Sequence, residues 1–64
     1  MKLTRAQREA LKRVWDRMTV ADVQPAPSYL AFRRSVQPYI GGDCVLVKFA
    51  GMWLGIESDG YTHS

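Results

Sequence analysis

The sequence lacks several features that mark common classes of small protein. Cys44 is its only cysteine, which excludes the intramolecular disulfides that stabilise many small secreted domains. No apolar run approaches the roughly 18 residues of a membrane-spanning helix, and the N-terminus leads into charged residues instead of a signal-peptide apolar stretch. We therefore expect a protein of a reducing compartment that stays where it is made and has no membrane partner.

Patterns for catalysis and metal binding are equally sparse. The only imidazole, His63, lies one residue from the C-terminus, where chain ends are usually mobile, so a nucleophilic triad is not expected. The 18 residues between Cys44 and His63 place them at opposite ends of the last predicted strand region, short of a zinc site unless carboxylates or another subunit contribute. Gly41-Gly42 lacks the lysine and helix of a phosphate-binding loop. We expect no enzyme, no metal and no cofactor.

The composition is that of an ordinary globular domain. A hydrophobic fraction of 47% and a charged fraction of 23% predict a packed core and argue against disorder. At 64 residues the chain forms one domain at most, and it buries only about 60% of its unfolded surface. The net charge of +3 favours anionic partners without requiring them.

Residues 4–18 carry the clearest helical pattern. Thr4 and Gln7 have the spacing of a capping box, in which each side chain bonds the other residue's backbone N–H. At 100° per residue one arc of this helix is apolar and consists of Leu3, Ala10, Leu11, Val14, Trp15 and Met18. Beyond it, β-branched residues and two prolines predict a linker over residues 20–27.

Residues 28–37 predict a second helix. Pro27 or Ser28 can open it, and Pro38 stops it. The same stretch also alternates with period two, which leaves a strand as the competing interpretation. In either form we expect three side chains to point inward: Tyr29, Leu30 and Phe32.

Residues 44–57 predict a β-hairpin around Ala50-Gly51. The expected register pairs Phe49 with Met52, Val47 with Leu54 and Val45 with Ile56, which gathers six apolar side chains on one face. The other face then carries Cys44, Leu46, Lys48, Trp53, Gly55 and Glu57. The turn is either type I′ or a type I turn with a glycine bulge.

A hairpin alone is marginal in water, so the two helices must cover its apolar face. The predicted fold is a two-layer α+β domain of order ααββ, with a short third strand left open. The polar tail, residues 58–64, is expected to fray or to dock simply, with Tyr61 folding back and His63 available to a partner as the alternative.

Trp53 is the leading candidate for a binding residue. The predicted register turns it away from the helices, and an exposed tryptophan is typical of protein interfaces. The competing interpretation is cross-strand packing over Gly55 and Leu46 with a cation–π contact to Lys48. We predict a protein-binding surface made of Trp53, Lys48, Leu46, Tyr61 and His63.

Basic side chains suggest a second kind of partner. Clustered cations can contact nucleic-acid phosphates, and the candidates here are Arg5, Arg8, Lys12, Arg13, Arg33 and Arg34. However, Glu9 lies four residues from both Arg5 and Arg13, and Lys12 lies four from Asp16, so part of this face is expected to pair internally.

Two stretches resemble known sequences. Tyr29–Val36 before Gln37-Pro38, and Gly51–Glu57 with Asp59–Ser64, are similar to small proteins encoded by tailed bacteriophages. The resemblance implies action in the bacterial cytoplasm or in a virion. Our leading hypothesis is a non-enzymatic interaction protein of phage type that binds a host or phage protein as an inhibitor, adaptor or virion accessory. Nucleic-acid binding is the alternative, and homo-oligomerisation is left open.

Overall fold

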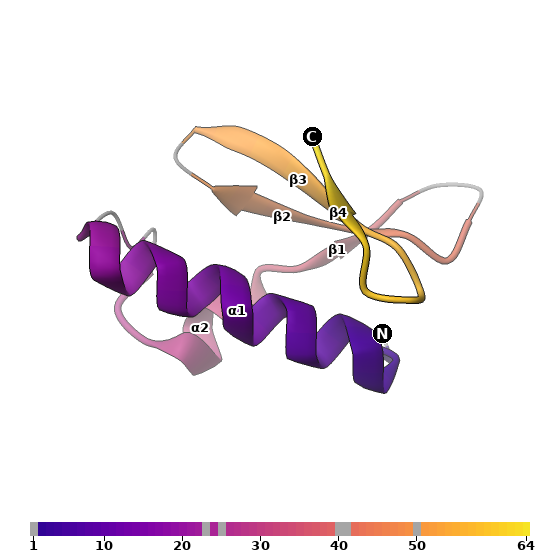
Figure 1. The fold of residues 1–64 in the computed structure, drawn as a ribbon, viewed down its shortest axis with the longest axis horizontal. Helices are drawn as coiled ribbons and strands as arrows, with labels where there is room; N and C mark the ends of the chain where they lie inside the picture. The colour runs from indigo at the N-terminus through magenta and orange to yellow at the C-terminus, as the bar shows by residue number, and fades with distance from the viewer. Residues whose placement is uncertain (1, 23, 25, 40–41, 50) are drawn as a thin grey trace.

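The structure is a computed structural model of the chain, and it describes residues 2–22, 24, 26–39, 42–49 and 51–64. Within these residues two helices precede a four-stranded antiparallel sheet, which confirms the predicted α+β class (Figure 1). In chain order the elements are α1 (Arg5–Ala21), α2 (Tyr29–Arg34), β1 (Gln37–Pro38), β2 (Val45–Phe49), β3 (Met52–Ile56) and β4 (Thr62–His63). Among the described residues, none of the helices has the length and apolar character needed to cross a membrane.

Helix α1 begins at the predicted capping box. The Thr4 hydroxyl accepts a hydrogen bond from the Gln7 amide at 3.0 Å, and the Gln7 side chain accepts one from the Thr4 amide at 2.9 Å. The helix runs past its predicted end at residue 18 to a left-handed C-cap at Asp22, so the start of the predicted linker is helical. β-branching lowers helix propensity only slightly, and the Thr19 hydroxyl is satisfied within the helix by donating to the Trp15 carbonyl at 3.0 Å.

Residues 29–34 form a helix and not a strand, but the helix is shorter than the predicted 28–37. Ser28 caps it, since its hydroxyl accepts from the Ala31 amide at 3.2 Å. The prediction that Leu30 points inward is wrong, because this side chain is 53% exposed. Residues two positions apart in a helix are separated by about 200°, so Leu30 cannot share the face of buried Phe32.

The hairpin has the predicted register. Strands β2 and β3 pair antiparallel, and the partners include Val45↔Ile56, Val47↔Leu54 and Phe49↔Met52. Gly51 has a φ of 82°, in the left-handed region that glycine tolerates, whereas Ala50 lies outside the described residues.

The face of the hairpin toward the helices is only partly enclosed. Val45, Val47 and Ile56 are buried, and Leu54 packs against them while half-buried. Met52, predicted to be covered, is about half exposed because it lies at the end of the hairpin. The predicted inward position of the Phe49 side chain falls outside the described part of the chain.

Two short strands extend the hairpin on both sides and give the order β1-β2-β3-β4. The sequence left open one strand beyond the hairpin, and the structure has two, β1 and β4. Strand β1 occupies Gln37–Pro38, where the second helix was predicted to end. In β4, Thr62 pairs with Ile56 and His63 with Gly55. The expectation that the tail frays is therefore wrong, whereas docking occurs in a specific form, because the tail pairs with β3 as the fourth strand.

The turn before β4 rests on the start of α1. The Thr4 hydroxyl donates to the Ser58 carbonyl at 2.7 Å. Gly60 has a φ of 90°, and a Cβ atom there would meet the Ala6 carbonyl oxygen at 2.9 Å. Only glycine meets both requirements, so the first and last parts of the chain lie in direct contact.

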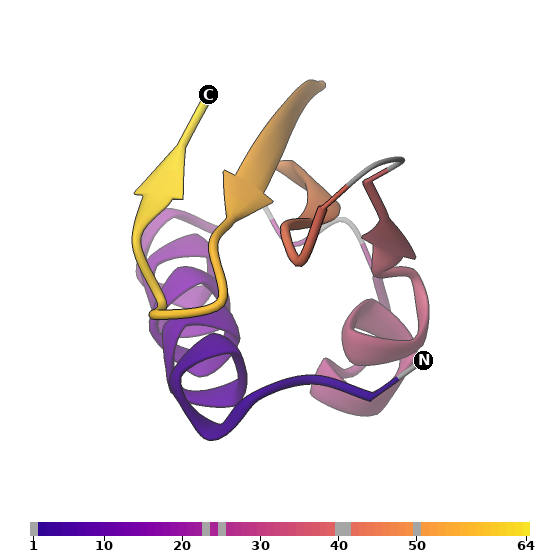
Figure 2. The ribbon, with the colours of Figure 1, turned by 90° about the vertical axis from the view of Figure 1, so that its right-hand side faces the viewer.

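Both helices cover the same face of the sheet (Figures 1 and 2). The core between the layers contains the predicted apolar arc of α1, with Trp15 buried as expected. The Trp15 ring lies 5.2 Å from the Phe32 ring and 6.2 Å from the Tyr29 ring, which joins the two helices through aromatic contacts. Neither α1 nor α2 lies over the opposite face of the sheet (Figure 2).

Gln7 connects the layers through polar contacts. It is only 2% exposed, and its side-chain amide donates to the Asp43 carbonyl at 2.8 Å and to the Ile56 carbonyl at 3.2 Å. Its oxygen is already used by the capping box at Thr4. One buried carboxamide thus satisfies backbone groups of α1, of the segment entering β2 and of β3.

Replacing this amide with a carboxylate tests its role. We expect Gln7→Glu to lower the free energy of unfolding by about 2 kcal/mol, because two buried carbonyls lose their donor and face a negative charge. Gln37→Glu, on exposed strand β1, is the matched control and should change stability by less than about 0.5 kcal/mol. Urea unfolding followed by tryptophan fluorescence measures both, and equal losses would contradict the role assigned to Gln7.

Candidate functional site on the outer face of the sheet

The register of the four strands determines which side chains face away from the helices. Since strand residues alternate between faces, the outer side of β2 and β3 is the one predicted from the hairpin. The pairing of β1 and β4 adds residues from both ends of the sheet. We define the outer face as Gln37, Tyr39, Cys44, Leu46, Lys48, Trp53, Gly55, Glu57, Tyr61 and His63.

Trp53 lies on this face as predicted, away from the helices. Its side chain is 45% exposed, and the Lys48 ammonium is 5.7 Å from the centroid of its ring. Both interpretations drawn from the sequence therefore hold in part: the indole is exposed, and it makes a cation–π contact. Leu46 is half-buried beside it.

Gly55 leaves room for the side chains of His63 and Cys44, because it has no side chain of its own. A Cβ atom at this position would lie 2.9 Å from His63 Cε1, 3.0 Å from His63 Nε2 and 3.1 Å from Cys44 Sγ. Any side chain here would collide with both groups. The imidazole and the thiol therefore approach one another across β3 because the residue between them, Gly55, has no side chain.

Cys44, Glu57 and His63 form a compact cluster. One donor atom from each, a sulfur, a carboxylate oxygen and an imidazole nitrogen, lies within 4.8 Å of the other two. His63 Nε2 is 2.6 Å from Glu57 Oε2. The expectation that Cys44 and His63 lie at opposite ends of the strand region is wrong, because β4 folds back alongside β3.

The electrostatics of the cluster act on the thiol. Burial raises the pKa of Cys44 above its ordinary value, and the neighbouring Glu57 carboxylate raises it further, partly by accepting a hydrogen bond. A raised pKa means less thiolate, which is the opposite of what a cysteine nucleophile needs.

The cluster forms one side of a cavity of about 600 Å³ on the outer face. Tyr39, Leu46 and Trp53 provide much of its apolar lining. Tyr61 flanks the site: it is 66% exposed, and its ring stacks on His63 at 6.0 Å with an interplanar angle of 23°. The structure thus brings together all five residues predicted for protein binding and adds Tyr39, Cys44 and Glu57.

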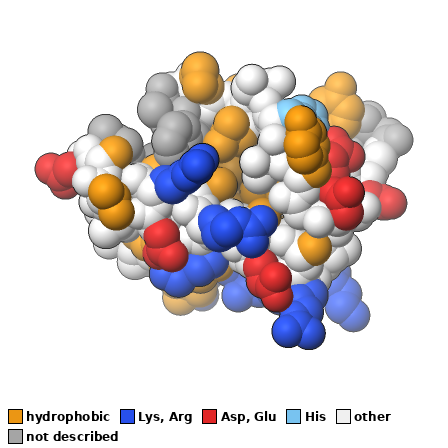
Figure 3. All heavy atoms as spheres, in the orientation of Figure 1, with side chains coloured by type: hydrophobic (Ala, Val, Ile, Leu, Met, Phe, Trp, Pro, Cys, Tyr) orange, Lys and Arg blue, Asp and Glu red, His pale blue; other side chains and the backbone are white. Residues whose placement is uncertain are grey.

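The basic residues line two neighbouring surfaces, and Arg8 belongs to both. On the exposed side of α1, Arg5 pairs with Glu9 at 3.1 Å and Lys12 with Asp16 at 2.7 Å, as the spacing predicted. Arg13 lies on the same exposed side, beside Arg5 and Lys12. Lysine and arginine side chains spread over this helical half of the surface, with acidic side chains between them (Figure 3).

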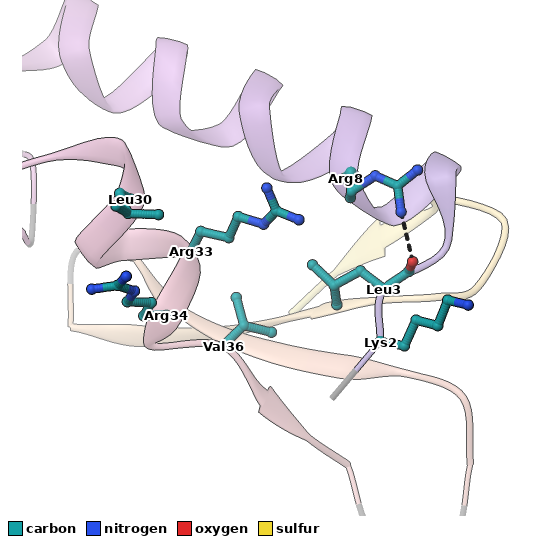
Figure 4. Close-up of a pocket in the computed structure, with 7 residues that line it drawn as sticks. All are labelled: Lys2, Leu3, Arg8, Leu30, Arg33, Arg34 and Val36. Carbon is teal, nitrogen blue, oxygen red and sulfur yellow. Dashed lines mark hydrogen bonds between the residues drawn. The ribbon is translucent and has the colours of Figure 1, made fainter.

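The second basic group lines a groove between the two helices. Arg8 from α1 and Arg33 from α2 extend into the space around Leu3 (Figure 4). Arg8 Nη1 donates to the Leu3 carbonyl at 2.9 Å, which fixes its position. The groove has a volume of about 570 Å³ and is also lined by Lys2 and Arg34. Three of the six predicted nucleic-acid-binding residues meet here, and Lys2 joins them.

Comparisons of the chain with protein-family models, with curated proteins and with solved structures found no match.

Substituting Gly55 tests how the outer face is built. In Gly55→Ala the new methyl group displaces the exposed His63 ring and separates it from Glu57. Stability should change by less than about 1 kcal/mol, because alanine restricts the unfolded chain more than glycine does and offsets part of the steric cost. NMR chemical shifts of the His63 ring measure the displacement.

Gly42→Ala is the matched control. Its Cβ would meet nothing closer than the Cys44 amide nitrogen at 4.0 Å, so the His63 resonances should stay in place. Unchanged His63 resonances in Gly55→Ala would show that the ring does not rest on this glycine.

Proposed function

We propose that the chain is a small non-enzymatic interaction protein that docks onto another protein through the outer face of its sheet. The observation that carries the proposal is the half-exposed Trp53, which strand register places on the outer face in cation–π contact with Lys48. Tryptophan and tyrosine dominate the binding energy of protein interfaces, because they bury a large area with few rotatable bonds. Two exposed tyrosines, Tyr39 and Tyr61, accompany Trp53 on this face.

An interface of ordinary size would occupy a large share of this small protein's surface. A standard protein interface buries about 800 Å² on each side, about a fifth of the 4498 Å² surface of this chain. The adjoining cavity has an apolar wall at Leu46 and Trp53, so the partner surface we infer presents an apolar or aromatic side chain to it.

The sequence resemblance adds an origin to this proposal. Similarity to small proteins of tailed bacteriophages favours a partner found in the bacterial host or in the phage particle. The protein would then act in the bacterial cytoplasm or in a virion, as an inhibitor, an adaptor or an accessory component.

Truncating the indole tests the docking surface. In Trp53→Ala, complexes recovered from host or infected cells with tagged protein should weaken by at least about tenfold, the loss expected for a central interface residue. The circular dichroism spectrum should be unchanged, since the ring is not part of the core.

Leu30→Ala is the control, because Leu30 is a large exposed apolar residue on α2, away from the outer face. It should leave the complexes intact. If Trp53→Ala recovers the same complexes as the unmodified protein, the outer face is not the docking surface.

Nucleic-acid binding is the second candidate function, and the basic groove favours it. Lys2, Arg8, Arg33 and Arg34 line one concave surface, and among the described residues no acidic side chain lines it with them. This clustering resembles the arrangement that phosphate contacts need. It ranks second because two of the other predicted cations, Arg5 and Lys12, are paired with carboxylates.

Salt dependence distinguishes the two functions. Four phosphate contacts would give a slope of about −3 to −4 for log affinity against log salt, whereas a tryptophan-centred interface responds weakly. Arg33→Gln should reduce retention of DNA or RNA in a low-salt gel shift more than Arg17→Gln, which removes the same charge outside the groove. No retention by the unmodified protein at low salt would remove this candidate.

A further inference from the structure

The Cys44–Glu57–His63 cluster on the outer face consists of side chains that commonly bind metal ions. A thiol, an imidazole and a carboxylate are the three side-chain types that ligate zinc in proteins. Cys44 precedes β2, Glu57 follows β3, and His63 belongs to β4, so hydrogen-bonded strands hold all three backbones in place. Charge attraction between exposed side chains does not explain the cluster, because the cluster includes the half-buried thiol of Cys44.

We propose that Cys44, Glu57 and His63 bind one Zn²⁺ ion, with the fourth coordination position open toward the cavity beside Trp53. This departs from the sequence-based expectation of no metal, which counted Cys44 and His63 alone. It goes beyond the proposed docking function and does not depend on it.

The geometry requires only a small adjustment. With bond lengths of about 2.3 Å to sulfur and 2.0–2.2 Å to nitrogen and oxygen, tetrahedral ligands lie about 3.5 Å apart. The donor atoms here are within 4.8 Å, so rotations that move them by about 1 Å suffice. His63 and Glu57 already approach to 2.6 Å, and an ion inserted between them replaces that contact.

The donor set selects the metal. Thiolate and imidazole favour zinc and similar transition metals, whereas Mg²⁺ and Ca²⁺ prefer all-oxygen sites. Zinc binds the thiolate, so the Cys44 proton is released to solvent as the metal–sulfur bond forms. Ligand and metal charges then sum to zero: +2 from zinc, −1 from the thiolate and −1 from Glu57.

Three protein ligands distinguish this site from a structural zinc site, which normally has four. Among the described residues the cluster contains no fourth His, Cys, Asp or Glu. The remaining position therefore takes water or a donor atom from a bound molecule. Since it faces the cavity, a ligand that lies against Leu46 and Trp53 can reach it.

The experiment uses the full chain without an affinity tag, freed of metal. Titration calorimetry with Zn²⁺ should give one site per chain with micromolar or tighter affinity. Co²⁺ in place of zinc should give the thiolate-to-cobalt charge-transfer band and the intense visible absorption of a four-coordinate ion.

Conservative variants assign the ligands. Cys44→Ser should abolish the charge-transfer band, and Glu57→Gln and His63→Gln should each weaken zinc binding by at least tenfold. Asp43→Asn is the matched control, because Asp43 lines the same cavity but is not in the cluster. It should bind zinc as the unmodified protein does.

Absence of saturable zinc binding, or binding that Cys44→Ser leaves unchanged, would overturn the proposal. Circular dichroism of each variant establishes that it is folded. A protein that binds zinc but captures no partner would retain this inference and lose the docking function, and the reverse result would do the opposite.

Discussion

The burial of the Gln7 carboxamide is the constraint on which the rest of the structure depends. A domain this small has few ways to fix the angle between a helix and a sheet, because apolar contacts are not directional. The hydrogen bonds of Gln7 are directional, and they tie the first turn of α1 to the backbone before β2 and at the end of β3. The aromatic contacts of Trp15 then position the short second helix.

This arrangement places the apolar surface of both helices on one side of the sheet, and neither helix covers the other side. The outer face follows from strand register, since alternation puts every second residue of each strand there. It gathers aromatic rings, one cation and the Cys44–Glu57–His63 cluster around a glycine. The basic groove lies on the opposite, helical side, so the two candidate surfaces are separated by the core.

Much of the fold could be predicted from the sequence, because local patterns determine it. The capping box, the apolar arc of α1 and the hairpin register all depend on neighbours within a few residues or on simple alternation. The end of α1 could not be predicted, because helix propensity is only a weak guide. The low helix propensity of Thr19 and Val20 did not reveal the C-cap at Asp22, whose backbone N–H bonds to the Met18 and Thr19 carbonyls. The cluster was missed because it depends on β4, whose two residues are too short for a periodic signal. The Asp59-Gly60 turn, followed by alternating Tyr61 and His63, was the available sign of a returning strand.

The contact between residues 4–6 and residues 58–60 has a consequence for the order in which this domain folds. The N-cap of α1 bonds to Ser58, 54 residues away, and Gly60 closes against Ala6. An isolated helix of this length is marginal in water, so α1 depends on strands that follow it far along the chain. Contacts of such large sequence separation form slowly, because the entropy of closing the loop is lost before they are made. The apolar arc of α1 therefore stays exposed in the folding chain until the sheet is in place.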